Sequence, residues 1–89
     1  QGLRISFPEL TSERRTQLSK IAGDKTEQAK TTLRSSRMDA LKALEVAEKA
    51  GGMGEDEMKR LKTEIQKIID AGNDSLVKIL KKKEEEIAQ

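Results

Sequence analysis

The feature that most constrains the fold is a glycine cluster between two long stretches with helical periodicity. Three glycines fall within residues 51–54, and such a cluster stops a helix and permits left-handed backbone. Before it, apolar and small residues recur at steps of three and four from Leu18 to Ala47, and after it they do so again from Met58 to Ile87. A helix with one buried stripe requires these steps. The sequence therefore predicts helices over about residues 12–49 and 55–87.

The two helices are expected to pair antiparallel and to form an all-α helical hairpin, because their stripes are close to a heptad repeat. Two helices cannot bury two such stripes as fully as three can. The pattern therefore predicts a missing partner, which could be a further helix, a second copy of the chain or a large assembly. Gly23 and Gly72 are expected to weaken the helices locally. The predicted stripe of the second helix comprises Met58, Leu61, Ile65, Ile68, Gly72, Leu76, Ile79, Leu80 and Ile87.

The composition favours helices and excludes several functional classes. Apolar residues make up 34% of the chain, charged residues make up 38%, and Phe7 is the only aromatic residue, so we do not expect a conventional globular core. The same balance is typical of disordered chains, and folding only on a partner stays an alternative. The absence of Cys and His removes thiolate nucleophiles, imidazole bases and the usual zinc ligands. No apolar run approaches the ~20 residues of a membrane span.

No motif of the sequence predicts catalysis. The glycine cluster lacks the strand and the Lys of a phosphate loop, and the acidic run at residues 55–57 lacks the spacing of a calcium loop. Two long helices offer little concavity in which carboxylates could act as acid and base. We therefore expect a protein that is not an enzyme, with no catalytic residue, metal, cofactor or small-molecule substrate.

Residues 1–10 are predicted to be an extended segment distinct from the helical domain of residues 11–89. Leu3, Ile5 and Phe7 alternate with other residues, as in a short strand. Pro8 ends this pattern, because it holds the preceding residue away from helical geometry. So short a strand is not stable alone, and we interpret it as the remnant of a strand that once had partner strands.

Lys30, Arg34 and Arg37 form a basic stripe on the first predicted helix. Their spacing of four and three residues places them on one face, about 100° from the apolar stripe. No acidic residue occurs between Glu27 and Asp39, so we expect nothing local to neutralise the stripe. A cationic stripe of this kind suits contacts with a phosphate backbone. The alternative is an ordinary solvated helix face.

Arg14 and Arg15 lie in the first turn of the same helix. Thr11 or Ser12 is predicted to cap this turn, but cations here oppose the helix dipole. An unfavourable placement suggests an outside partner, although Glu13 can compensate. Both interpretations stay open for this pair.

The chain resembles the ribosome recycling factor family. The resemblance is carried by residues 10–15 (Leu-Thr-Ser-Glu-Arg-Arg), by the pair Arg34 and Arg37, and by their separation along the chain. It extends over nearly the whole chain without gaps. Further matching positions include Pro8, Lys20, Glu27, Lys30, Ala40, Lys59, Gln66 and Asp70.

The resemblance implies an L-shaped protein, in which a three-helix bundle is joined by a hinge to a small β-rich domain inserted after the first helix. This chain then corresponds to the returning hinge and to bundle helices two and three. It also implies a translation factor, in the bacterial cytoplasm or in an organelle (mitochondrion or chloroplast), that splits post-termination ribosomes together with elongation factor G. The implied hinge residues are Phe7, Pro8, Glu9 and Leu10.

Carried over by position, Arg34 and Arg37 are the implied contacts with large-subunit ribosomal RNA, with Arg37 the strongest candidate. Lys30, Arg14 and Arg15 are added as further candidates for RNA binding. Met38 stands where the family has a second consecutive Arg, so weaker RNA contacts are expected. The alternative functions are a structural helical-hairpin interaction module and a static ribosome-associated protein without recycling activity.

Overall fold

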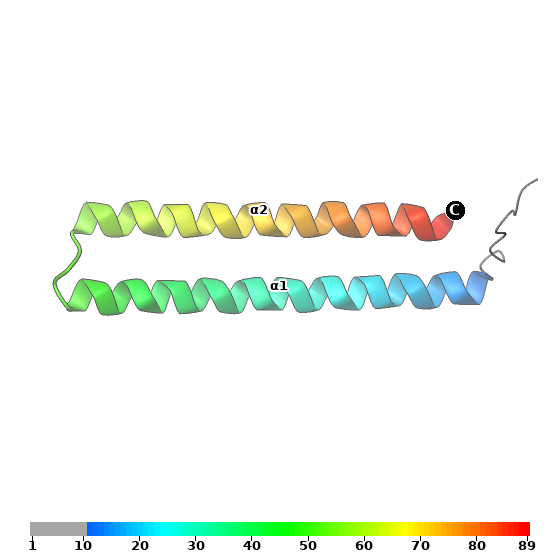
Figure 1. Cartoon of the computed structure of the whole chain (residues 1–89), viewed down its shortest axis with the longest axis horizontal. Helices are drawn as coiled ribbons and strands as arrows, with labels where there is room; N and C mark the ends of the chain where they lie inside the picture. Colours follow the sequence, from blue (N-terminus) through cyan, green and yellow to red (C-terminus); the bar gives the residue numbers. More distant parts are fainter. Residues whose placement is uncertain (1–10) are drawn as a thin grey trace, which may run out of the picture.

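The computed structural model describes residues 11–89, which form two long antiparallel α-helices. Helix α1 spans Ser12–Lys49 and helix α2 spans Glu55–Ala88, and a short loop joins them (Figure 1). The predicted all-α helical hairpin is confirmed, and only the end of α2 differs, by one residue, from the predicted bounds. The predicted hinge at residues 7–10 and the strand remnant before it lie outside the described residues. Neither α1 nor α2 has the length and apolar character needed to cross a membrane.

Both ends of α1 are capped by hydrogen bonds between residues close in sequence. Thr11 is the N-cap residue, and its Oγ1 accepts a hydrogen bond of 3.0 Å from the backbone N–H of the third helical residue. At the other end, Gly51 has a φ of +80°, a left-handed conformation that favours glycine. Its N–H donates to the carbonyl of Glu48, and the N–H of Gly52 donates to that of Ala47, which together make a Schellman motif. The glycine cluster therefore ends α1 in the way that the sequence predicts.

Helix α2 begins differently, because its N-cap residue is Gly54 and no side chain caps the first turn. The first turn instead carries Glu55, Asp56 and Glu57. Negative charge is favourable at this end of a helix, where the backbone N–H groups have no intrahelical partner. The start of α2 therefore depends on electrostatics more than on a cap.

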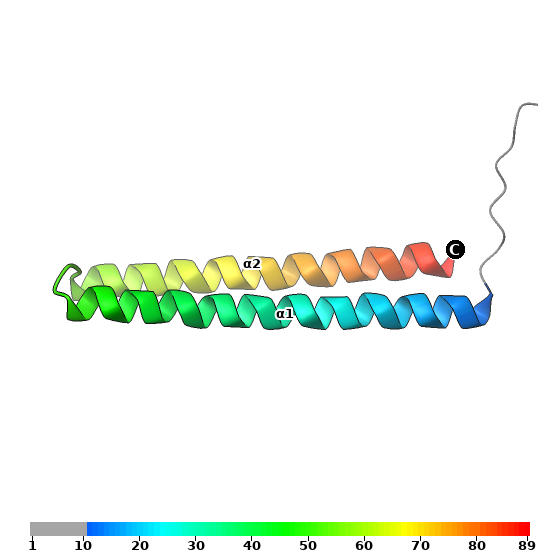
Figure 2. The ribbon, with the colours of Figure 1, turned by 60° about the horizontal axis from the view of Figure 1, so that its bottom comes forward.

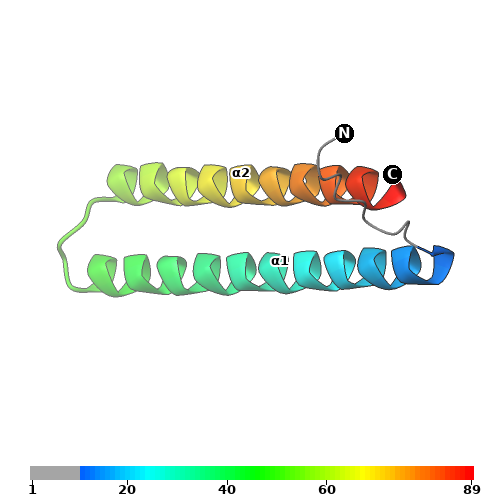
Figure 3. The same ribbon diagram turned by 45° about the vertical axis from the view of Figure 1, so that its right-hand side comes forward.

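The two helices pack side by side along their length, as all three views agree (Figure 1, Figure 2 and Figure 3). Among residues 11–89 only two hydrophobic residues are buried, Met58 and Ile69. By contrast, Ile21 and Ile79 keep 49% and 56% of their surface exposed. A second helix covers only part of each apolar stripe, so much apolar surface stays open. This is the condition that the sequence predicts for a hairpin with a missing partner.

The predicted apolar stripe of α2 leaves out the isoleucine that is buried best. The stripe contains Ile68, but the structure buries Ile69 and leaves Ile68 67% exposed. Steps of three and of four residues from Ile65 both fit the helical period, so periodicity alone cannot choose between the two isoleucines. The rotation of α2 about its axis, which the packing against α1 sets, turns Ile69 inward.

Helix α2 continues without a break through Gly72, where the sequence predicts a local weakness. A Cβ atom at this position would lie 3.1 Å and 3.3 Å from two methyl carbons of Leu33. The missing side chain thus lets Leu33 of α1 approach the backbone of α2 closely. A Cβ atom at Gly23, in contrast, would meet no atom within 4 Å. Gly72 therefore has a packing role, whereas Gly23 has none within the hairpin.

The line where the two helices touch divides the surface of the hairpin into two flanks, of which the first is apolar. On one side, an apolar groove of about 470 Å³ is lined by Ile21 of α1 and by Leu76 and Ile79 of α2, among others. Leu76 also lines an adjoining depression beside Leu33 and Gly72. We call this surface the apolar flank. Its lining residues fall within residues 18–33 of α1 and 72–87 of α2. A further helix laid against these residues would cover it.

Candidate nucleic-acid interface

The basic stripe lies on the side of the hairpin opposite the apolar flank. Each residue turns an α-helix by about 100°, so Lys30, Arg34 and Arg37 fall on one side of Leu33, and Ile21 falls on the other. Lys30 and Arg37 are half-buried against α2, whereas Arg34 is exposed. We call the surface formed by these three cations and the adjoining residues of α2 the basic flank. The structure therefore brings together all three residues of the predicted stripe.

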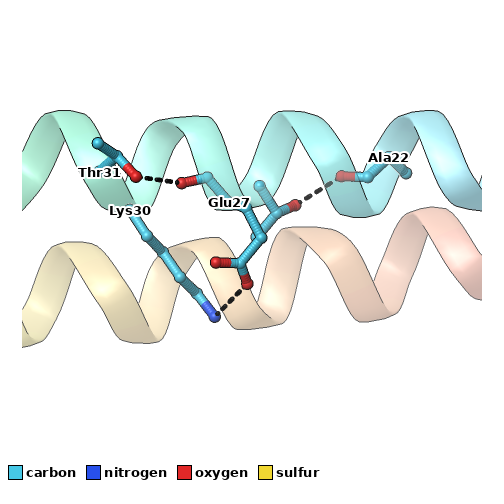
Figure 4. A network of polar contacts seen from close by, with 5 residues as sticks. Ala22, Glu27, Lys30 and Thr31 are labelled. Carbon is cyan, nitrogen blue, oxygen red and sulfur yellow. Dashed lines mark hydrogen bonds and ion pairs between the residues drawn. The ribbon is translucent and has the colours of Figure 1, made fainter.

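Lys30 is not free of local acidic groups, contrary to the expectation from the sequence. Its Nζ lies 3.6 Å from Oε1 of Glu27, one turn earlier (Figure 4). The expectation considered the segment between Glu27 and Asp39 and left out the acid at its border. The side chain of Glu27 is 69% exposed, and an exposed ion pair contributes only about 0–1 kcal/mol. The ion pair with Glu27 therefore contributes little to the stability of α1.

Three threonines of α1 turn their hydroxyl groups back onto the helix. Thr31 Oγ1 donates to the carbonyl of Glu27 at 3.1 Å, and Thr26 Oγ1 donates to that of Ala22 at 2.8 Å (Figure 4). Thr32 does the same with the carbonyl of Gln28. With their donors used inside α1, these side chains present short methyl-bearing surfaces. Thr26 and Thr32 line the apolar groove and the depression that adjoins it, so neither of them borders the basic stripe.

Arg34 is the most accessible cation of the basic flank. Its guanidinium has no hydrogen bond or ion pair within residues 11–89. It borders a shallow depression that it shares with Lys30, Asn73, Asp74 and other residues of α2. All its N–H donors are therefore available to an external acceptor.

Arg37 is held by α2. Its Nε donates a hydrogen bond of 2.9 Å to Oε1 of Gln66, and Nε2 of Gln66 donates one of 2.9 Å to Oδ1 of Asp70. Arg37, Gln66 and Lys62 line a groove of about 360 Å³ between the helices. Gln66, Asp70 and Lys62 are not among the site residues predicted from the sequence. Only the antiparallel pairing, which sets residue 37 opposite residue 66, reveals them.

Arg14 and Arg15 are not part of the basic flank. Arg15 lies about 33 Å from Arg37 along α1, at 1.5 Å per residue. Its Nη2 donates to the backbone carbonyl of Gln89 at 3.3 Å, which links the start of α1 to the end of α2. Its Nε is buried and has no partner among residues 11–89. Arg14 is exposed. The structure therefore gives Arg15 a role between the helices and leaves Arg14 at the surface.

Comparisons with known proteins identify the family. A family model described as ribosome recycling factor matches residues 1–88. The ribosome-recycling factor of Caulobacter sp. is 48% identical over 88 residues, which are 99% of this chain and 47% of that protein. The protein of the same name from Rhizorhabdus wittichii is 46% identical over 71 residues, or 80% of this chain and 38% of the relative. The chloroplastic ribosome-recycling factor of Daucus carota is 40% identical over 85 residues, or 96% and 37%. No solved structure matches the chain.

The match extends over both helices and the loop between them, and it confirms the resemblance inferred from residues 10–15 and from the pair Arg34 and Arg37. The chain spans less than half of the length of each of these three relatives. The chain therefore belongs to the ribosome recycling factor family.

Proposed function

We propose that this chain acts in ribosome recycling by binding large-subunit ribosomal RNA through its basic flank. The observation that carries the proposal is the arrangement of Lys30, Arg34 and Arg37 along one side of the hairpin. Arg34 has no partner within residues 11–89, and Arg37 is fixed through its Nε alone. Guanidinium groups of this kind suit phosphate oxygens, because they offer several N–H donors in a rigid plane.

The proposed mechanism is non-covalent. The helical rod docks through phosphate contacts, and elongation factor G, as the proposed partner, drives the movement that separates the ribosomal subunits. This requires neither a reacting side chain nor a cofactor. Phosphate contacts position a protein on RNA without reading its sequence, which suits a factor that meets the same ribosomal surface in every cycle.

The proposed architecture assigns residues 1–10 to a hinge and residues 11–89 to a helical bundle domain. The apolar flank supports it, because a groove lined by Ile21, Leu76 and Ile79 is open between residues 18–26 of α1 and residues 76–87 of α2. A third helix, in addition to α1 and α2, would cover this flank and complete the bundle. Relatives from bacteria and from a chloroplast support a location in the bacterial cytoplasm or in an organelle.

Replacing Arg37 tests the RNA contact. Arg37→Ala should raise the Kd for the large ribosomal subunit roughly tenfold, since a charge-assisted hydrogen bond is lost. A salt titration should show a slope that is shallower by about 0.7 to 0.9 for each lost phosphate contact. Arg60→Ala is the matched control, because Arg60 is exposed on α2 and makes no hydrogen bond or ion pair within residues 11–89. Binding that is unchanged across the titration would remove the RNA hypothesis.

Besides a static ribosome-associated protein without recycling activity, the second candidate function is a structural helical-hairpin interaction module that docks a partner through exposed apolar side chains. The exposure of Ile68 and Ile79 favours it. This candidate predicts that Ile68→Ser abolishes partner binding while Arg37→Ala changes it little. The RNA-binding candidate predicts the reverse order of effects in the same binding assay.

A further inference from the structure

Three residues from both helices form a continuous polar chain on the basic flank. Nε of Arg37 donates to Oε1 of Gln66, and Nε2 of Gln66 donates to Oδ1 of Asp70, each at 2.9 Å. Gln66 and Asp70 are separated by four residues, so they lie one turn apart on the same face of α2. Arg37 comes from α1, and this series of hydrogen bonds therefore links the two helices.

The chemistry of the three groups allows this series of hydrogen bonds to run in one direction only, from Arg37 through Gln66 to Asp70. A guanidinium can only donate hydrogen bonds, and an ionised carboxylate can only accept them. The amide of Gln66 between them has one accepting atom and one donating atom. Only one orientation of the amide satisfies both neighbours, so Asp70 fixes Gln66, and Gln66 in turn fixes Arg37.

We propose that Gln66 and Asp70 are positioning residues that hold the Arg37 guanidinium in place for a phosphate of RNA. This inference rests on the proposed function of the basic flank. The bond to Gln66 occupies Nε, and within residues 11–89 neither Nη atom of Arg37 has a hydrogen bond or an ion pair. The N–H groups of both Nη atoms thus stay available while the side chain is restrained. A free Arg must lose this side-chain freedom when it binds.

The carboxylate of Asp70 restrains Arg37 without pairing with it directly. No ion pair between the two side chains occurs within the described residues, because the amide of Gln66 stands between them. Lys62 and Glu45 line the same groove as Arg37, so the groove holds a second cation together with one acidic group. Arg34, three residues earlier on α1, has no such restraint. The basic flank therefore combines one Arg that a hydrogen bond restrains with one Arg that makes no hydrogen bond or ion pair within residues 11–89.

The restraint itself can be measured on the 89-residue chain without any RNA. The side-chain Nε–H signal of Arg37 in a nitrogen-15 NMR spectrum should be resolved and should exchange slowly with water. Gln66→Ala and Asp70→Ala should each speed this exchange, whereas Asp70→Asn keeps an acceptor for Gln66 and should not. The control is Gln17→Ala, because Gln17 is exposed on α1 and has no side-chain hydrogen bond within residues 11–89. An Nε–H signal that none of these substitutions changes would overturn the proposal.

The consequence for binding is measured with a double-mutant cycle on the large ribosomal subunit. Gln66→Ala and Asp70→Ala should each raise Kd roughly two- to tenfold, the range expected when one long side chain must be ordered on binding. In the Arg37→Ala background, Gln66→Ala should have no further effect, because it acts through Arg37. If Gln66→Ala raises Kd equally with and without Arg37, Gln66 contacts RNA itself. If Asp70→Ala lowers Kd, the carboxylate of Asp70 competes with RNA for Arg37. Either result contradicts the proposal.

The two measurements separate this inference from the proposed function. Suppose that the Nε–H of Arg37 exchanges slowly but the Arg37→Ala variant binds the subunit as tightly as the unchanged chain. The hypothesis that Arg37 binds RNA is then refuted, and a positioning role for Gln66 and Asp70 has no purpose. If Arg37→Ala weakens binding but Gln66→Ala does not, the positioning role fails and the proposed function stands. Circular dichroism of each variant should show unchanged helicity, since Gln66 and Asp70 are exposed.

Discussion

Met38 leaves the basic flank one cation short of the pattern that the family resemblance implies. Its side chain is 59% exposed and follows Arg37 directly, one turn after Arg34. Met38→Arg should therefore tighten binding to the large ribosomal subunit at low salt, and it should steepen the salt dependence by about 0.7 to 0.9. Met38→Gln, which adds no charge, should leave the slope unchanged. A steeper slope with both substitutions would contradict an electrostatic cause.

At the same scale, the sequence predicts the cations of the site but not their partners. Lys30, Arg34 and Arg37 could be placed on one face because the helical period is local. The pair of Lys30 with Glu27 was also within reach, since the two residues are three positions apart. The contact of Arg37 with Gln66 was not, because 29 positions separate the residues. It depends on the axial register and the rotation of two helices, which no local pattern encodes.

The two glycines inside the helices should respond differently to the same substitution. Alanine is about 1 kcal/mol more favourable than glycine within a helix. At Gly23, a Cβ atom meets nothing within 4 Å, so Gly23→Ala should raise Tm by about 4–8 °C, as expected for a chain of this size. At Gly72, a Cβ atom would lie 3.1 Å from a methyl carbon of Leu33. Gly72→Ala should therefore raise Tm by less than Gly23→Ala, or lower it.

Thermal unfolding followed by circular dichroism measures this difference between the glycines. The double variant Leu33→Ala with Gly72→Ala provides the control, because removing the Leu33 methyl groups should remove the penalty at Gly72. Equal stabilisation by the two single substitutions would mean that Leu33 moves aside freely. The helix bounds themselves followed from local signals, the Thr11 cap and the glycine cluster. The packing of Leu33 against Gly72 is visible only when both helices are in place.

As a whole, residues 11–89 form a thin layer of two helices with an open apolar flank on one side and the basic flank on the other. The deficit of buried surface is predictable from the sequence, because two stripes of this length exceed what one helix–helix contact can cover. The position of the opening, opposite Arg34 and Arg37, is not predictable in this way, because it depends on how the helices are rotated. With this separation, the third helix and the RNA contact that we propose would occupy different flanks and would not exclude each other.

An uncovered apolar flank should make the 89-residue chain associate with itself as concentration rises, because exposed contiguous apolar surface promotes association. Ile79→Ser should reduce this association, which sedimentation equilibrium measures. Val77→Ser is the matched control: Val77 and Ile79 are 54% and 56% exposed on α2, but Val77 borders the depression beside Lys30 and Arg34. Equal loss of association with both substitutions would indicate nonspecific contact between chains. A chain that stays monomeric at every concentration would show that the apolar flank does not drive association, which weakens the case for a third helix covering it.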